Sequence, residues 1–234
     1  MLGTFFYNAA PPIFRNSVIY LQSSNAFQES YGEQYWDEVK THVLITLESV
    51  GVATAICFPL GIIGSRVRLA RVAATNVVGI ARSIPGIAVL FVMWQRLGAT
   101  EANAIFAMTL LAAPPIFLNT VAGYASVDPA IVEAARGMGM GKLQVLTRVE
   151  TPLAASVIVA GIRTATVEIV ASATIVAFIN VNTLGVQIFD GVEDPSTTTG
   201  QAELAVGIFG VAMLAWIAEA MLTYFQRVVT PRYA

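Results

Sequence analysis

Charged residues are scarce in this 234-residue sequence. Aspartate, glutamate, lysine and arginine make up 12% of it, while 56% of the residues are hydrophobic. A soluble domain has about twice that share of charged residues. The mean hydropathy is +0.69, and the polar residues are too few to cover a globular surface. The composition therefore predicts an integral membrane protein, and no long polar stretch is available for a separate soluble domain.

Cysteine and histidine each occur once, as Cys57 and His42. A single cysteine excludes an intramolecular disulfide and a cysteine-rich metal site. His42 is at the outer edge of an apolar stretch without companion ligands, which predicts a surface residue. The net charge of −2 argues against a nucleic-acid partner. The sequence has no Ser/His/Asp set, paired acids or cofactor motif, so we expect no catalytic, cofactor or metal site in this chain.

Five apolar stretches are long enough to cross a bilayer, which takes about 20 residues. They predict an all-α integral membrane protein with about five transmembrane helices, at 43–64, 72–94, 102–122, 153–179 and 202–225. Residues 1–40 are interrupted by Pro11, Pro12 and Arg15, which is unlike a signal peptide. They predict an extracytoplasmic or interfacial segment, with a sixth span as the open alternative.

Basic residues predict the orientation, because they gather in cytoplasmic loops. They follow the first, third and fifth spans: Arg66, Arg68, Arg71, Arg136, Lys142, Arg148, Arg227 and Arg232. The loop after the fourth span has Asp190, Glu193 and Asp194 but no lysine or arginine. This pattern predicts an N-terminus outside the cell, a transmembrane domain over 41–227 and a cytoplasmic tail over 228–234.

The segment VEAARGMGMGKLQVLTRVETP, residues 132–152, has glycines and a lysine and invites comparison with a phosphate-binding loop. A Walker A loop needs G-x-x-x-x-G-K-[ST]. Here Leu143 follows Lys142, and Arg136 stands where the first glycine belongs. The G-x-G-x-x-G pattern fails as well, since Lys142 replaces its last glycine. The segment therefore does not bind a nucleotide.

Two short helices joined by a glycine bend fit the segment better. Asp128 is a good N-cap, and Pro129 suits the first helical turn. The glycines then interrupt the helix, and KLQVLTRVETP predicts a second helix that ends at Pro152. An exposed pair of helices between two spans is suited to docking a partner.

The spelling of this segment resembles the EAA loop of the membrane subunits of binding-protein-dependent ABC importers. Glu133-Ala134-Ala135 is followed by Gly139 and by the closing Val149-Glu150-Thr151-Pro152, with Val149 and Thr151 replacing the usual isoleucine and leucine. The resemblance implies a type I ABC importer-like permease, in which residues 128–152, here called the EAA loop, dock into an ATP-hydrolysing subunit. The implied docking residues are Glu133, Ala134, Ala135, Arg136, Gly139, Lys142 and Pro152.

Further stretches, including GIARSIPGIAVL and VIVAGIRTATV, resemble the branch that imports glycine betaine, carnitine and choline. That resemblance implies a transport subunit that is not itself an enzyme, with ATP and magnesium held by a partner ATPase. It also implies a second permease subunit, identical or related, and a separate extracytoplasmic substrate-binding protein. Another small amine or an amino acid remains an alternative substrate.

Four ionisable residues are placed within the predicted spans: Glu48, Arg82, Arg163 and Glu168. Charges inside a bilayer are costly unless they are paired, so we expect ion pairs, with Arg82–Glu168 the favoured one. The acids also leave open an ion-coupled secondary transporter, which uses carboxylates near the membrane midplane. A non-transporting scaffold subunit is a third possibility, and dependence of uptake on an ATP-binding partner distinguishes all three.

Small residues at near-helical spacing, Gly61 with Gly64 and Gly207 with Gly210, predict close helix packing.

Overall fold

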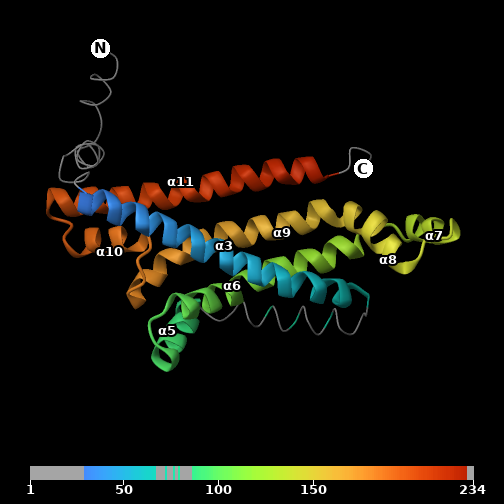
Figure 1. The fold of residues 1–234 in the computed structure, drawn as a ribbon, viewed down its shortest axis with the longest axis horizontal. Coiled ribbons are helices and arrows are strands. Elements are labelled where there is room, and N and C mark those ends of the chain that lie inside the picture. Colours follow the sequence, from blue (N-terminus) through green and yellow to red (C-terminus); the bar gives the residue numbers. More distant parts are fainter. Residues whose placement is uncertain (1–28, 67–71, 73–75, 77–78, 80–85, 231–234) are drawn as a thin grey trace, which may run out of the picture.

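A computed structural model describes residues 29–66, 72, 76, 79 and 86–230, and the regular structure of these residues is entirely helical (Figure 1). The elements are α3 (Glu29–Arg66), α5 (Gly86–Leu97), α6 (Glu101–Ala125), α7 (Pro129–Gly137), α8 (Lys142–Val145), the π-helical turn η1 (Leu146–Glu150), α9 (Thr151–Ser172), the 3-10 helix η2 (Ala173–Ile179), α10 (Gly185–Glu193) and α11 (Thr198–Val229).

Helices α3, α6 and α9 pack together along the long axis of the molecule, and α11 lies against α9 (Figure 1). Their shared core includes Ile45, Ile116 and Ile169, each at most 1% exposed. At Gly61 the backbones of α3 and α6 come so close that an added Cβ would lie 2.6 Å from Cβ of Thr120. The close packing that the sequence predicts at this glycine is confirmed.

Among the described residues, four helical segments are long and apolar enough to cross a membrane: Glu33–Arg66, Glu101–Ala125, Lys142–Ile179 and Thr198–Val229. Each contains one of the spans predicted from the sequence. The span predicted at 72–94 lies largely outside the described residues, and α5 includes only its last part. Residues 1–28 also lie outside the described residues, so the extracytoplasmic or interfacial N-terminal segment stays a prediction there.

Two features differ from the predicted arrangement. Helix α3 begins at Glu29, well before residue 43, because glutamate, glutamine and lysine in the polar stretch favour a helix. The acidic loop after the fourth span contains a helix, α10, which packs against α11. The fourth span ends at Ile179, as predicted; its last residues form η2, and Asn180 follows with a left-handed φ of 57°.

His42 is buried rather than exposed, so its prediction as a surface residue is wrong. Its side chain is 0% exposed, and its ring Nε2 lies 2.9 Å from the carbonyl oxygen of Val170. The reason is that α3 continues outward past His42, and the outer end of α9 covers this turn of α3.

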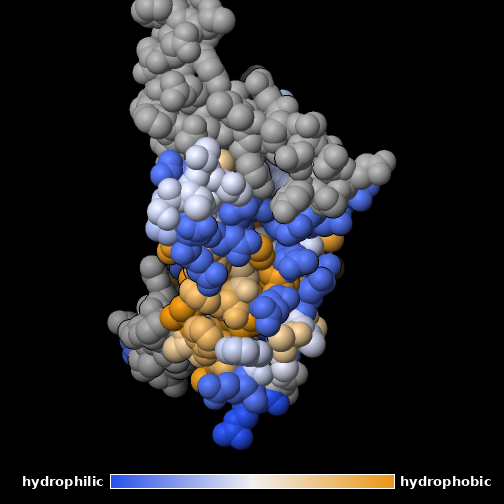
Figure 2. All heavy atoms as spheres, turned by 90° about the vertical axis from the view of Figure 1, so that its left-hand side faces the viewer, coloured by the Kyte–Doolittle hydropathy of each residue, from blue (hydrophilic) through white to orange (hydrophobic). Residues whose placement is uncertain are grey.

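The two ends of the bundle differ in what they present. Helices α7 and α8 project at one end, and α5 and α10 lie toward the other (Figure 1). Figure 2 shows the second end, where hydrophilic residues surround a smaller apolar area. By the positions of its basic residues, the end with α7 and α8 is the one predicted to face the cytoplasm.

Candidate site for docking a partner subunit

The EAA loop begins with a capped helix, as the sequence predicts. Asp128 has an extended backbone, with φ −60° and ψ 122°, and its carboxylate accepts a hydrogen bond of 2.8 Å from the backbone N–H of Ala130. Pro129 occupies the first turn of α7, where the missing N–H costs nothing. This cap fixes the point at which the chain leaves α6 and enters the loop.

The bend between α7 and α8 depends on one glycine. Gly139 has a φ of +87°, which side-chain-bearing residues rarely adopt, and an added Cβ there would meet nothing within 4 Å. The requirement at Gly139 is therefore for its backbone conformation and not for space. Gly141 follows with an ordinary φ of −69°, and its N–H donates to Oε1 of Gln144 at 2.9 Å.

The second half of the EAA loop differs from the sequence prediction of a helix that ends at Pro152. The chain passes from α8 through the π-helical turn η1 into α9 without a break. The backbone N–H of Thr151 donates to the carbonyl of Leu146, five residues earlier, and the Thr151 hydroxyl donates to the same oxygen at 2.7 Å. Pro152 therefore falls in the first turn of α9, where proline is tolerated.

Most of the residues predicted to dock a partner are on the surface. Five of them are exposed: Glu133, Ala134, Arg136, Gly139 and Lys142. Ala135 is 2% exposed and packs inside the loop, and Pro152 is partly buried. Two apolar side chains that were not predicted to dock, Met138 and Leu143, are 76% and 72% exposed. Exposed apolar side chains among charged ones are typical of a surface that binds another protein.

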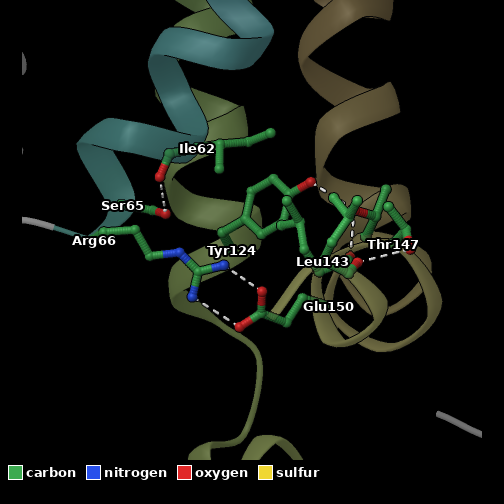
Figure 3. A network of polar contacts seen from close by, with 9 residues as sticks. Ile62, Ser65, Arg66, Tyr124, Leu143, Thr147 and Glu150 are labelled. Atoms are coloured by element: carbon green, nitrogen blue, oxygen red, sulfur yellow. Dashed lines mark hydrogen bonds and ion pairs between the residues drawn. The ribbon is translucent and has the colours of Figure 1, made fainter. Parts of the chain in front are cut away.

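A network of polar contacts ties the base of the EAA loop to the bundle (Figure 3). Arg66, the last residue of α3, points its guanidinium at the carboxylate of Glu150, the last residue of η1. Nη1 donates to Oε1 at 2.8 Å, and Nη2 donates to Oε2 through a second, shorter bond. The Glu150 side chain is 6% exposed and that of Arg66 is 45% exposed. The two parallel bonds form a bidentate ion pair, which fixes both distance and orientation.

Tyr124 of α6 joins the same network from the other side. Its ring lies beneath the Arg66 guanidinium, with 6.0 Å from Cζ to the ring centroid. Its hydroxyl is 2.8 Å from the Thr151 hydroxyl. Because Thr151 donates its proton to Leu146, we assign Tyr124 as the donor to Thr151. The ends of α3 and α6 and the start of α9 are thus held together at one point.

This network was not predicted from the sequence. Arg66 counted only as a marker of orientation, and Glu150 only as part of the closing motif. The two residues are 84 positions apart, so no local spacing connects them. The available signal was that a carboxylate beside a predicted span requires a cationic partner.

Of the four ionisable residues predicted within the spans, Arg163 has partners on α11 that were not predicted. Nη1 of Arg163 donates to the Thr223 hydroxyl at 3.1 Å and lies 3.5 Å from the carboxylate of Glu219, an acid that the sequence analysis did not consider. Arg82 lies outside the described residues, so the Arg82–Glu168 pair stays a prediction. Glu48 on α3 and Glu168 on α9 are both exposed in the single chain.

Residues 58–233 match the family described as the binding-protein-dependent transport system inner membrane component. Because the match covers most of the chain, the protein belongs to this family of inner-membrane transport permeases. The resemblance found in the sequence is thereby confirmed.

Several curated relatives match over nearly their whole length. The glycine betaine/carnitine/choline transport system permease protein OpuCD of Bacillus subtilis (strain 168) is 32% identical, with 90% of this chain and 91% of that protein covered. The choline transport system permease protein OpuBD of the same strain is 31% identical, with 90% and 92% covered. The osmoprotectant import permease protein OsmY of Salmonella typhimurium is 32% identical, with 81% and 80% covered.

Solved structures confirm the expected fold class. An inward-facing structure of the MetNI methionine ABC transporter matches with a TM-score of 0.73 at 20% identity, covering 87% of this chain and 99% of that one. An amino acid ABC transporter matches with a TM-score of 0.66 at 17% identity, covering 84% and 94%. At these identities the likeness concerns the fold alone, which is that of a type I ABC importer permease.

Proposed function

We propose that this chain is the membrane-spanning subunit of an ATP-driven importer that brings a small osmoprotectant such as glycine betaine, carnitine or choline into the cell. The observation behind this proposal is that relatives about one-third identical over nearly the full length of both chains are permeases for these compounds. The exposed EAA loop supplies the complementary structural argument, because it offers a surface on which an ATPase can dock.

Hydrolysis in this proposal takes place on a separate ATP-binding subunit, which holds ATP and magnesium. A substrate-binding protein delivers the osmoprotectant from outside, as the family description implies. A second permease subunit, identical or related, completes the translocation path. When ATP draws two ATP-binding subunits together, the docked EAA loops move, and the helices alternate between inward-facing and outward-facing arrangements.

Several residues of the EAA loop have separate roles in this docking. Met138 and Leu143 supply apolar contact area at the tip of the loop. Glu133, Arg136 and Lys142 supply charges around it, which favour one orientation of the partner. Ala134 and Gly139 permit close approach, and Ala135 keeps the two short helices packed. In this arrangement the loop faces the cytoplasm together with the C-terminus, and the N-terminus lies outside.

The test uses cells that lack their own osmoprotectant uptake. The permease is expressed with and without its ATP-binding subunit and its binding protein, and entry of labelled glycine betaine is followed. Gly139→Asp is compared with Gly98→Asp, because Gly98 has a similar φ of +89° in open space but precedes α6 at the opposite end of the bundle. Retention of the ATP-binding subunit on the purified permease is measured for both variants.

We expect uptake that requires the ATP-binding subunit, with docking and uptake lost in Gly139→Asp and docking kept in Gly98→Asp. Uptake without the ATP-binding subunit would contradict the proposal and make Glu48 and Glu168 candidates for ion coupling. Stimulated ATP hydrolysis without betaine entry would retain the importer and exclude this substrate, leaving another amine or an amino acid.

A further inference from the structure

The junction between the EAA loop and the membrane bundle is where any movement of the loop must enter the bundle. Helix α7 packs against α8 and η1, so a force on the loop reaches η1 before it reaches the long helices. Glu150 is the last residue of η1, and its side chain is almost completely buried against Arg66. The ion pair therefore lies on the mechanical path from the loop to α3.

We propose that Arg66 and Glu150 are positioning residues for coupling: their bidentate ion pair passes the displacement of the EAA loop to α3, so that ATP hydrolysis is converted into transport. This inference rests on the proposed function and adds to it a residue pair outside the EAA-loop residues predicted to dock. It assigns the pair a role in the ratio of transport to hydrolysis, beyond that of holding the fold together.

An ion pair is better suited than the surrounding apolar contacts to pass a displacement of the EAA loop to α3. Leu146 of η1 also packs against an apolar cluster that includes Tyr124 and Ile158. Apolar packing is non-directional and permits sliding, whereas two parallel N–H···O bonds are lost together when either partner rotates. Figure 3 shows the carboxylate and the guanidinium facing each other between the two elements.

The π-helical turn makes this position suited to movement. Such single turns are frequent at functional sites and interrupt the regular ladder of hydrogen bonds. In η1 the acceptor of the Thr151 N–H lies five residues back, at Leu146. A wide turn next to a fixed ion pair allows α7 and α8 to tilt relative to α9, while Glu150 keeps its hold on α3.

The test measures two quantities in proteoliposomes that contain the complete importer: betaine transported and ATP hydrolysed. Glu150→Gln keeps the shape but removes the charge, and Arg66→Lys keeps the charge but removes the planar fork. Arg66→Gln and the double variant Arg66→Gln/Glu150→Gln complete a double-mutant cycle with Glu150→Gln. Tyr124→Phe is the local control, because it removes the hydroxyl beside the ion pair but leaves the ring in place.

We expect betaine transported per ATP to fall about tenfold in each single variant of the ion pair, within the usual range of coupling between sites. The double variant should be no worse than either single one, because both residues act through one contact. Tyr124→Phe should keep the wild-type ratio. Thermal unfolding and recovery of the assembled complex are measured for every variant.

Three results would overturn the inference. In the first, transport, hydrolysis and the amount of complex recovered all fall by the same factor, which would make the pair purely structural. The losses could multiply in the double variant, which would mean independent roles. The ratio could also stay unchanged. A wild-type complex without ATP-dependent uptake would instead contradict the proposed function, so the two failures are distinguishable.

Discussion

The carboxylate of Glu38 accepts two hydrogen bonds from the side-chain amide of Gln187, at 3.0 and 3.2 Å, across 149 positions of sequence. Glu38 is 1% exposed and Gln187 is 8% exposed. The contact fastens α10 to α3 at the end of the bundle opposite the EAA loop. Because a buried carboxylate that loses its donors is costly, this contact is a point at which stability can be tested.

Replacing Gln187 by leucine should destabilise the protein by about 2–3 kcal/mol, the cost of removing hydrogen bonds to a charged buried group. The side chain keeps a similar size, so packing changes little. Thermal unfolding of the purified permease in detergent measures the effect, and a midpoint lower by about 5 °C is expected. Gln34→Leu is the control, because Gln34 also donates to Glu38, at 3.3 Å, but is exposed. Equal melting of the two variants would refute the assigned role of Gln187.

Gly61→Ala should destabilise the protein by about 1–3 kcal/mol, because the new methyl group overlaps Thr120 across the contact between α3 and α6. Gly51→Ala, in the same helix, meets nothing within 4 Å. It should be neutral, or more stable by about 0.5–1 kcal/mol, because alanine favours the helix. Thermal unfolding of both variants decides the matter, and a neutral Gly61→Ala would show that these helices are not closely packed.

Arg163→Met should lower the amount of folded permease recovered from membranes, because Glu219 loses its cation. A lone charge at the centre of a membrane helix costs about 2.5–3.5 kcal/mol on insertion scales, and Glu219 lies within the apolar segment Thr198–Val229. The double variant Arg163→Met/Glu219→Gln should recover much of the loss. Size-exclusion chromatography of the solubilised protein measures recovery, and a double variant as poor as the single one would exclude the pair.

Asp128→Ala should weaken binding of the ATP-binding subunit about fivefold, because loss of an N-cap costs about 1 kcal/mol and frays the first turn of α7. Asp128→Asn retains a capping oxygen and should bind like the wild type. Titration of the solubilised permease with the ATP-binding subunit measures the affinity. Thr100→Ala removes a comparable cap from α6 at the other end of the bundle, and a similar weakening there would argue against a local effect.

The features that follow from local sequence were predictable. Apolar runs of sufficient length predicted the four long helical segments of the described chain. The Asp128-Pro129 pair predicted the start of α7, because caps and hydrophobicity act over a few residues. Gly139 was singled out through the family resemblance, and the structure adds its positive φ as the physical reason.

The features that depend on distant contacts were not predictable from one sequence. The burial of His42, the pairing of Arg66 with Glu150 and the pairing of Arg163 with Glu219 all join helices far apart in the chain. Two helices also extend beyond the bounds predicted from the sequence. Helix α3 extends through a polar stretch, and α9 continues through Pro152 because the π-helical turn supplies a different hydrogen-bond acceptor.

Transport by the purified importer in sealed proteoliposomes tests the central claim most directly. The permease is reconstituted with its ATP-binding subunit and binding protein, ATP and magnesium are enclosed on the side of the EAA loop, and glycine betaine accumulation is measured. We predict accumulation against a gradient that requires ATP and persists when ionophores abolish proton and sodium gradients. Accumulation that occurs without ATP and follows an imposed ion gradient would contradict the account.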